Sequence, residues 1–201
     1  PPRDPEAIEM LEKAYYDSGY EITAMLRVLF TSDFFKNSRF ARVKSPVELV
    51  VGVLRLTEEI GWPTREIHDV AMITGYMGQE LMNPTSVEGW HEGPEWIDSG
   101  ALVERVNFVA HELANVENPG VRKIIDRLAG EGVLSPEDLV DRCLDLLGPM
   151  EVSEETRESL VEYVAHQGDL SLHGHQPGDA AEKRVGGLLS LACATKEFQL
   201  A

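Results

Sequence analysis

The sequence predicts an all-α protein, a multi-helix bundle of about nine helices with one long loop rich in proline, glycine and tryptophan. Apolar residues recur at helical spacing along most of the chain, and several such stretches begin with a capping side chain followed by proline. No run alternates apolar and polar residues with the period of two that a half-buried strand requires. The 201 residues suffice for a single helical domain, 1–201, with a looser subdomain over 118–201 as the alternative.

Charge and length exclude several classes of function. The chain carries 18 Lys and Arg against 35 Asp and Glu, a net charge of −17, and so lacks the positive surface that nucleic acid needs in a partner. No apolar run reaches the roughly 18 residues of a membrane span. Because the chain starts at Pro1 without Met, we expect a fragment of a longer protein.

Cys143 and Cys193 lie in helical apolar patterns, which favours buried free thiols over a disulfide.

The first helices are predicted from their caps. Asp4 followed by Pro5 starts the first helix, and a second is predicted over 22–31. Residues 45–48, Ser-Pro-Val-Glu, form a capping box that starts a third. The residues behind it, 49–54, are apolar nearly all round, which predicts a central helix that others surround.

The later helices are separated by one long irregular stretch. Thr64 can cap a helix that runs to Leu81, in which Gly75 and Gly78 indicate a close helix crossing or a local break. Residues 83–99 are irregular. Further helices are predicted with the apolar stripe Leu102, Val106, Val109 and Leu113, after the starts at Asn118, Ser135 and Ser153, and with the final stripe Val185, Leu188, Leu189 and Ala192.

The loop 83–98 is the best candidate for a functional site, since loops of this length are uncommon and often functional. Its two indoles could stack on a sugar or another planar ligand beside polar side chains. Alternatively, both indoles plug the bundle and the prolines stiffen a long crossover. The candidate ligand-binding residues are Gln79, Asn83, Trp90, His91 and Trp96.

The remaining polar groups have simpler explanations. His166, His173 and His175 could bind a transition metal weakly, although histidines in a Gly/Pro-rich loop are usually only solvated. Glu48 and Arg55, seven residues apart, could form a functional pair, but the capping box alone accounts for Glu48.

A second polar stripe, formed by Glu104, Asn107 and His111, is best explained as a solvated helix face. The sequence has no nucleophile elbow, phosphate-binding loop or Cys-x-x-Cys motif. We therefore predict no catalytic residue and no cofactor.

Three groups of segments together resemble one bacterial family. They are 25–35 with 43–51, 77–84 with 87–90 and 93–97, and 184–199. Their order is similar to the C-terminal portion of the family named domain of unknown function 1800. The most specific part is Gly89-Trp90 and then Trp96, after a helix that contains Gly78-Gln79.

The resemblance implies a mostly helical, exported bacterial protein, periplasmic or extracellular, of which this chain is a part. The His- and Asn-rich motifs of the family's N-terminal portion have no counterpart here. The chain also departs from the family at Pro84-Thr85, where a double proline is usual, and at His91, where proline is common.

Two functional hypotheses follow. In the first, the chain acts in binding or assembly through the tryptophan loop, with the missing N-terminal region, another protein or a glycan as partner. In the second, it is the C-terminal part of a hydrolase whose active site the missing region completes, with His91, Glu92 or Asn107 near a shared cleft.

Overall fold

The computed structural model describes residues 4–61, 65–174 and 179–201. Within these residues the chain forms ten α-helices, two 3-10 helices and two very short strands, which confirms the predicted all-α fold. The elements are α1 (Pro5–Asp17), α2 (Ile22–Thr31), α3 (Asp33–Lys36), α4 (Pro46–Thr57), α5 (Glu66–Tyr76), η1 (Gly93–Ile97), α6 (Ser99–Ala114), α7 (Pro119–Ala129), β1 (Val133–Leu134), α8 (Pro136–Leu147), α9 (Glu154–Ala165), β2 (Leu170–Ser171), α10 (Ala180–Cys193) and η2 (Glu197–Gln199).

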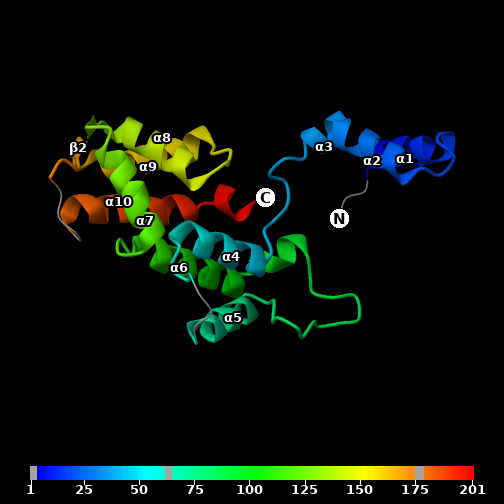
Figure 1. Ribbon diagram of the computed structural model, residues 1–201, viewed down its shortest axis with the longest axis horizontal. Helices are drawn as coiled ribbons and strands as arrows, with labels where there is room; N and C mark the ends of the chain where they lie inside the picture. Colours follow the sequence, from blue (N-terminus) through cyan, green and yellow to red (C-terminus); the bar gives the residue numbers. More distant parts are fainter. Residues whose placement is uncertain (1–3, 62–64, 175–178) are drawn as a thin grey trace. The chain divides into compact units, whose positions relative to one another are not determined.

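The chain divides into two compact units. The smaller contains residues up to Arg42 together with Ala201, and in it α1 packs against α2 (Figure 1). The larger runs from Val43 to Leu200 and contains the remaining helices. A single domain over 1–201 stays a prediction, as does the looser subdomain over 118–201. Inside the larger unit, α10 packs on α6, so residues before and after position 118 share one core.

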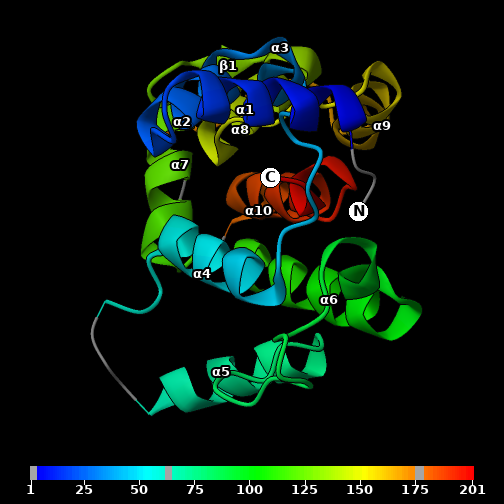
Figure 2. The same ribbon diagram turned by 90° about the vertical axis from the view of Figure 1, so that its right-hand side faces the viewer.

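The core of the larger unit lies where α10 runs along α6 and meets the α8–α9 pair (Figures 1 and 2). Six helices contribute fully buried aliphatic side chains to it. These include Leu49, Val53, Val109, Leu113, Ile125, Leu128, Leu139, Val164, Leu188 and Leu189. Among the described residues, no helix combines the length and the apolar composition needed to cross a bilayer.

A small antiparallel ladder departs from the expectation of no sheet. Val133 pairs with Ser171, and Leu134 pairs with Leu170. Strands of two residues are too short to show an alternating pattern, so sequence periodicity could not predict them.

Local capping chemistry starts the helices as predicted. The Asp4 carboxylate accepts hydrogen bonds from the backbone N–H groups of the first turn of α1. Both halves of the capping box at α4 are present: Glu48 N–H donates to Ser45 Oγ, and Ser45 N–H donates to Glu48 Oε2. At α8 and α9 a serine side chain caps the helix: Ser135 Oγ accepts from the Asp138 N–H, and Ser153 Oγ accepts from the Thr156 N–H.

Close helix crossings depend on glycines that the sequence did not single out. A Cβ atom at Gly120 in α7 would lie 1.8 Å from the backbone oxygen of Leu56, so α7 crosses α4 at this point. Gly78 instead adopts a positive φ of 96°, which is the local break predicted for it. The predicted helix to Leu81 therefore ends at Tyr76, and its predicted cap, Thr64, lies outside the described residues.

The inner face of α6 is also partly polar, which differs from the predicted apolar stripe. Arg105 is fully buried, whereas Leu102 is exposed. The Arg105 guanidinium donates to Gln199 Oε1 at 2.8 Å and to the Lys44 carbonyl at 2.7 Å. These bonds tie α6 to residues next to both ends of the larger unit.

Both cysteines, Cys143 and Cys193, are buried free thiols, as predicted. Burial raises the pKa of Cys143 to about 12 and also raises that of Cys193. Neither thiol is therefore ionised at neutral pH.

Candidate functional site between helices α4 and α5

Helix α4 has two apolar sides, and only one of them is covered. Leu49, Val50 and Val53 are buried in the core, where α4 packs against α6 and α7. On the other side Val51 remains 40% exposed. The expectation of a central helix surrounded by others holds in part: α4 packs against α5, α6 and α7, but a hollow on the side toward α5 leaves Val51 partly exposed.

The opposite wall of this hollow is α5. Ile67, Val70, Ala71 and Thr74 follow one another at spacings of three, one and three residues, which places them on one helix face. Ile67 is 41% exposed even though it lines the hollow. Figure 2 shows α4 and α5 as neighbouring helices of the larger unit.

The hollow between the two helices, which we call the α4–α5 groove, has a volume of about 600 Å³. Most of its lining side chains are aliphatic. It is lined by Val47, Val50, Val51, Leu54, Arg55, Glu58, Ile60, Gly61, Ile67, Val70, Ala71, Thr74 and Leu81. Pockets of this size with mostly apolar walls and few polar groups are typical of ligand sites, including those between helices of bundles.

The polar groups of the groove differ in what they already bind. The Glu58 carboxylate accepts hydrogen bonds from Lys123 Nζ at 2.6 Å, and the Thr74 hydroxyl donates to the Ala71 carbonyl at 2.8 Å. Arg55 is exposed and has no hydrogen-bond or ion-pair partner within the described part of the chain. Its guanidinium is therefore the charge in the groove that a ligand could bind.

The tryptophan loop begins earlier than the predicted residue 83, because α5 ends at Tyr76; it covers residues 77–98 and is attached to one end of this groove. The Val47 backbone N–H donates to Gln79 Oε1 at 3.0 Å, which joins the start of the loop to the first turn of α4. Leu81, two residues further on, lines the groove and is 43% exposed. The loop and the groove thus form one continuous surface.

Within the loop, Glu80 holds two of the predicted site residues. Trp90 Nε1 donates to the Glu80 carbonyl at 2.9 Å, and Asn83 Nδ2 donates to the Glu80 carboxylate at 2.8 Å. Trp90 is half-buried. Its indole N–H is thus already used inside the loop.

The other two predicted residues lie elsewhere. Trp96 in η1 is only 5% exposed, and η1 packs against α6. This indole is therefore buried in the larger unit, as predicted by the alternative in which the tryptophans have a structural role. His91 is exposed and its Nδ1 lies 2.5 Å from Glu95 Oε2. Asn83 and Trp90 thus share Glu80 as a partner, whereas Trp96 is buried and His91 pairs with Glu95.

The remaining candidates are on the surface. His166 and His173 are exposed, and His175 lies outside the described residues. Among the residues that the structure describes, no group of three or more His, Cys, Asp or Glu side chains could hold a metal ion. Glu104, Asn107 and His111 form an exposed face of α6, as expected.

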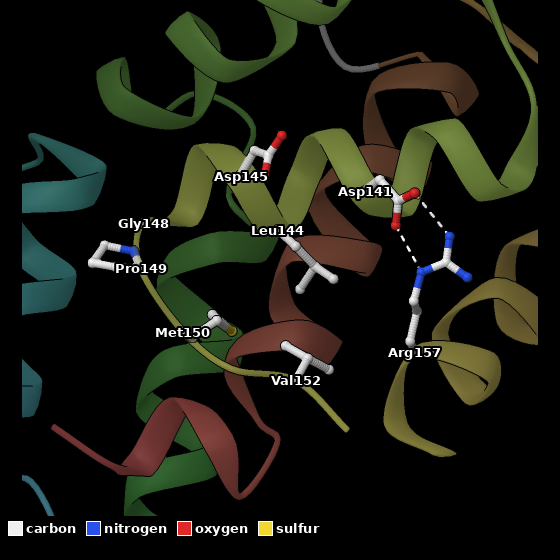
Figure 3. Close-up of a pocket in the computed structure, with 8 residues that line it drawn as sticks. All are labelled: Asp141, Leu144, Asp145, Gly148, Pro149, Met150, Val152 and Arg157. Atoms are coloured by element: carbon white, nitrogen blue, oxygen red, sulfur yellow. Dashed lines mark hydrogen bonds and ion pairs between the residues drawn. The ribbon is translucent and has the colours of Figure 1, made fainter. Parts of the chain in front are cut away.

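A second hollow, of about 660 Å³, lies at the turn between α8 and α9 (Figure 3). Leu144, Met150 and Val152 provide its apolar part. At its edge, Arg157 Nε and Nη2 each donate to one Asp141 carboxylate oxygen at 2.8 Å. Because the arginine is already paired in both positions, the described residues that line this hollow offer no free cationic side chain, whereas the α4–α5 groove offers Arg55. The other charge at this hollow, Asp145, is an exposed carboxylate.

Sequence reasoning missed the residues that line the α4–α5 groove. The available signal was the helix that is apolar nearly all round, residues 49–54, followed by the apolar stripe Ile67, Val70 and Ala71. An all-round apolar helix is buried or lies beside a ligand site. Sequence alone does not distinguish the two.

The structure thus shows an all-α fold with an open apolar groove between two of its helices. The chain belongs to the family described as Protein of unknown function (DUF1800), whose profile matches residues 1–200. That it is the C-terminal portion of a family member stays a prediction. No curated protein and no solved structure matches the chain.

Proposed function

We propose that this chain is a binding module of an exported bacterial protein, and that its binding surface is the α4–α5 groove with the adjoining loop 77–98. The observation that carries the proposal is the open hollow of about 600 Å³ between two apolar helix faces. Leaving Val51 and Ile67 partly exposed forgoes hydrophobic stabilisation of about 25 cal/mol for each Å². A ligand that covers them recovers that free energy.

The loop contributes to this surface through aliphatic side chains more than through indoles. Trp96 is buried, and the N–H of Trp90 is bonded within the loop, so glycan stacking has less support than it had from sequence. Met82 is 94% exposed and Val87 is fully exposed. These two side chains suit a protein partner at the loop.

The groove can be tested with Nile red, an uncharged dye whose fluorescence rises in apolar surroundings. We expect the wild-type chain to bind it, and the Ala71→Phe variant, which places a phenyl ring in the groove, to lose most of that signal. Ala165→Phe, at an exposed position on α9, is the matched control. Circular dichroism checks that both variants fold. Equal dye binding by all three chains would refute the groove as the binding surface.

The hydrolase alternative has one supporting observation. His91 Nδ1 lies 2.5 Å from Glu95 Oε2, and a carboxylate on one imidazole nitrogen leaves the other nitrogen able to exchange a proton. A longer chain that includes the rest of the family should then hydrolyse ester or glycoside substrates, and His91→Ala should abolish this activity. Activity that survives the substitution excludes His91 as a participant.

A further inference from the structure

We propose that the α4–α5 groove binds an aliphatic carboxylate, with the alkyl chain between the two helix faces and the carboxylate on Arg55. This inference rests on the proposed function and names the ligand class of the same site. It follows from three properties of the groove: its apolar walls, its length and Arg55, which is the one lining charge without a partner among the described residues.

The walls favour an alkyl chain over a planar or polar ligand. Val47, Val51 and Leu54 face the hollow from α4, opposite Ile67 and Val70 of α5. The lining contains no aromatic side chain on which a ring could stack. Hydroxyl-rich ligands would lose most of their hydrogen bonds to water, because the described lining offers few polar groups. These are Arg55, Glu58, which already binds Lys123, and Thr74, whose hydroxyl already donates to a carbonyl.

The groove also has the length of an extended chain. Helices α4 and α5 contain 12 and 11 residues. The lining residues run from Val47 to Glu58 and from Ile67 to Thr74, so at 1.5 Å per residue the α4 wall is roughly 17 Å long and the α5 wall roughly 11 Å. A linear alkyl chain can therefore lie along the groove and contact residues on successive turns of both helices.

Arg55 determines the head group. A guanidinium binds a carboxylate through two parallel hydrogen bonds, and Arg55 has no competing partner within the described residues. The nearby Glu58 would repel an anion, but its charge is paired with Lys123. Because the whole chain carries a net charge of −17, burial of the alkyl chain must supply most of the affinity.

Isothermal titration calorimetry with octanoate, decanoate and 1-decanol tests this inference. We expect decanoate to bind about 15-fold more tightly than octanoate, since each buried methylene contributes about fourfold. Arg55→Gln should weaken decanoate binding about tenfold and leave 1-decanol unchanged. Arg127→Gln, an exposed arginine on α7, is the matched control and should change neither.

The outcomes separate this inference from the proposed function. If Nile red binds and Ala71→Phe blocks it, but decanoate and 1-decanol bind equally with or without Arg55, the binding module stands and the carboxylate inference is wrong. The inference also fails if Nile red binds while none of the three aliphatic compounds does. If neither the dye nor any aliphatic ligand binds the wild-type chain, both proposals fail.

Discussion

Replacing Gly120 by alanine should destabilise the larger unit strongly, because α7 touches the backbone of α4 at that residue. An added Cβ would lie 1.8 Å from the Leu56 oxygen and 2.8 Å from the Leu56 and Thr57 carbonyl carbons. Real Cβ contacts are essentially never shorter than 3.0 Å, so the two helices would have to separate by more than 1 Å. The obstacle is backbone and cannot rotate away.

The expected cost is about 3 kcal/mol or more, at the upper end of the usual range for overpacking. A matched control lies in α4 itself. Gly52 is exposed, and a Cβ there would meet nothing within 4 Å. Because glycine is a poor residue inside a helix, Gly52→Ala should stabilise the chain by about 0.5–1 kcal/mol. The same chemical change is therefore predicted to act with opposite sign at the two positions.

Urea unfolding followed by far-ultraviolet circular dichroism measures both variants. We expect a lower midpoint for Gly120→Ala and a slightly higher one for Gly52→Ala, with similar slopes against urea. A Gly120→Ala chain as stable as wild type would show that α7 does not cross α4 so closely. The packing of α4, and with it the shape of the groove, would then need revision.

Three further predictions concern buried groups. Burial, and then the neighbouring carboxyl of Glu59, raise the pKa of Glu112 to about 8. Between pH 4.5 and 8 the folded chain thus keeps a proton that the unfolded chain loses, so stability should fall as pH rises, by at most about 1.4 kcal/mol per pH unit. Glu112→Gln should flatten this decline in urea titrations at several pH values. Trp96→Ala should cost about 3–5 kcal/mol, and Trp90→Ala less than about 2 kcal/mol, in the same unfolding assay. Both thiols should react with a thiol reagent at neutral pH only as fast as the chain unfolds, which absorbance kinetics with and without urea will measure.

Each of these predictions has a contradicting result. A wild-type stability that rises between pH 5 and 8 with the slope unchanged by Glu112→Gln would mean that this carboxyl is ionised in the folded chain. If Trp90→Ala and Trp96→Ala lowered the free energy of unfolding equally, the difference in burial between the two indoles would be contradicted. Rapid modification of either cysteine in the folded chain would show that its helix is not packed as described.

Helix starts could be predicted because their causes are local. Ser45 and Glu48 bond to each other's backbone within four residues, and Ser135 and Ser153 cap their helices over the same distance. The C-terminal end of α5 was harder to predict from the sequence. Gly75 and Gly78 indicated a close helix crossing or a local break, and Gly78 does adopt a positive φ, but the helix ends at Tyr76 and not at Leu81.

The candidate site was only partly predictable. Sequence indicated the loop around Trp90, and the loop does join the groove through Gln79 and Leu81. It did not indicate that Trp96 would be buried while Val51 stayed exposed. Both outcomes depend on contacts between segments far apart in the chain, and side-chain type alone does not specify them.

The sequence by itself determined the helical class, the places where most helices begin and the family, because periodicity, caps and local motifs act within a few residues. Tertiary structure decided which apolar face of α4 enters the core and which borders the groove. It also decided that Gly120 lies against Leu56 and that Arg105 binds Lys44 and Gln199. The physical reason is that hydrophobic burial has no preferred direction, so only the packing of distant helices selects which surfaces meet.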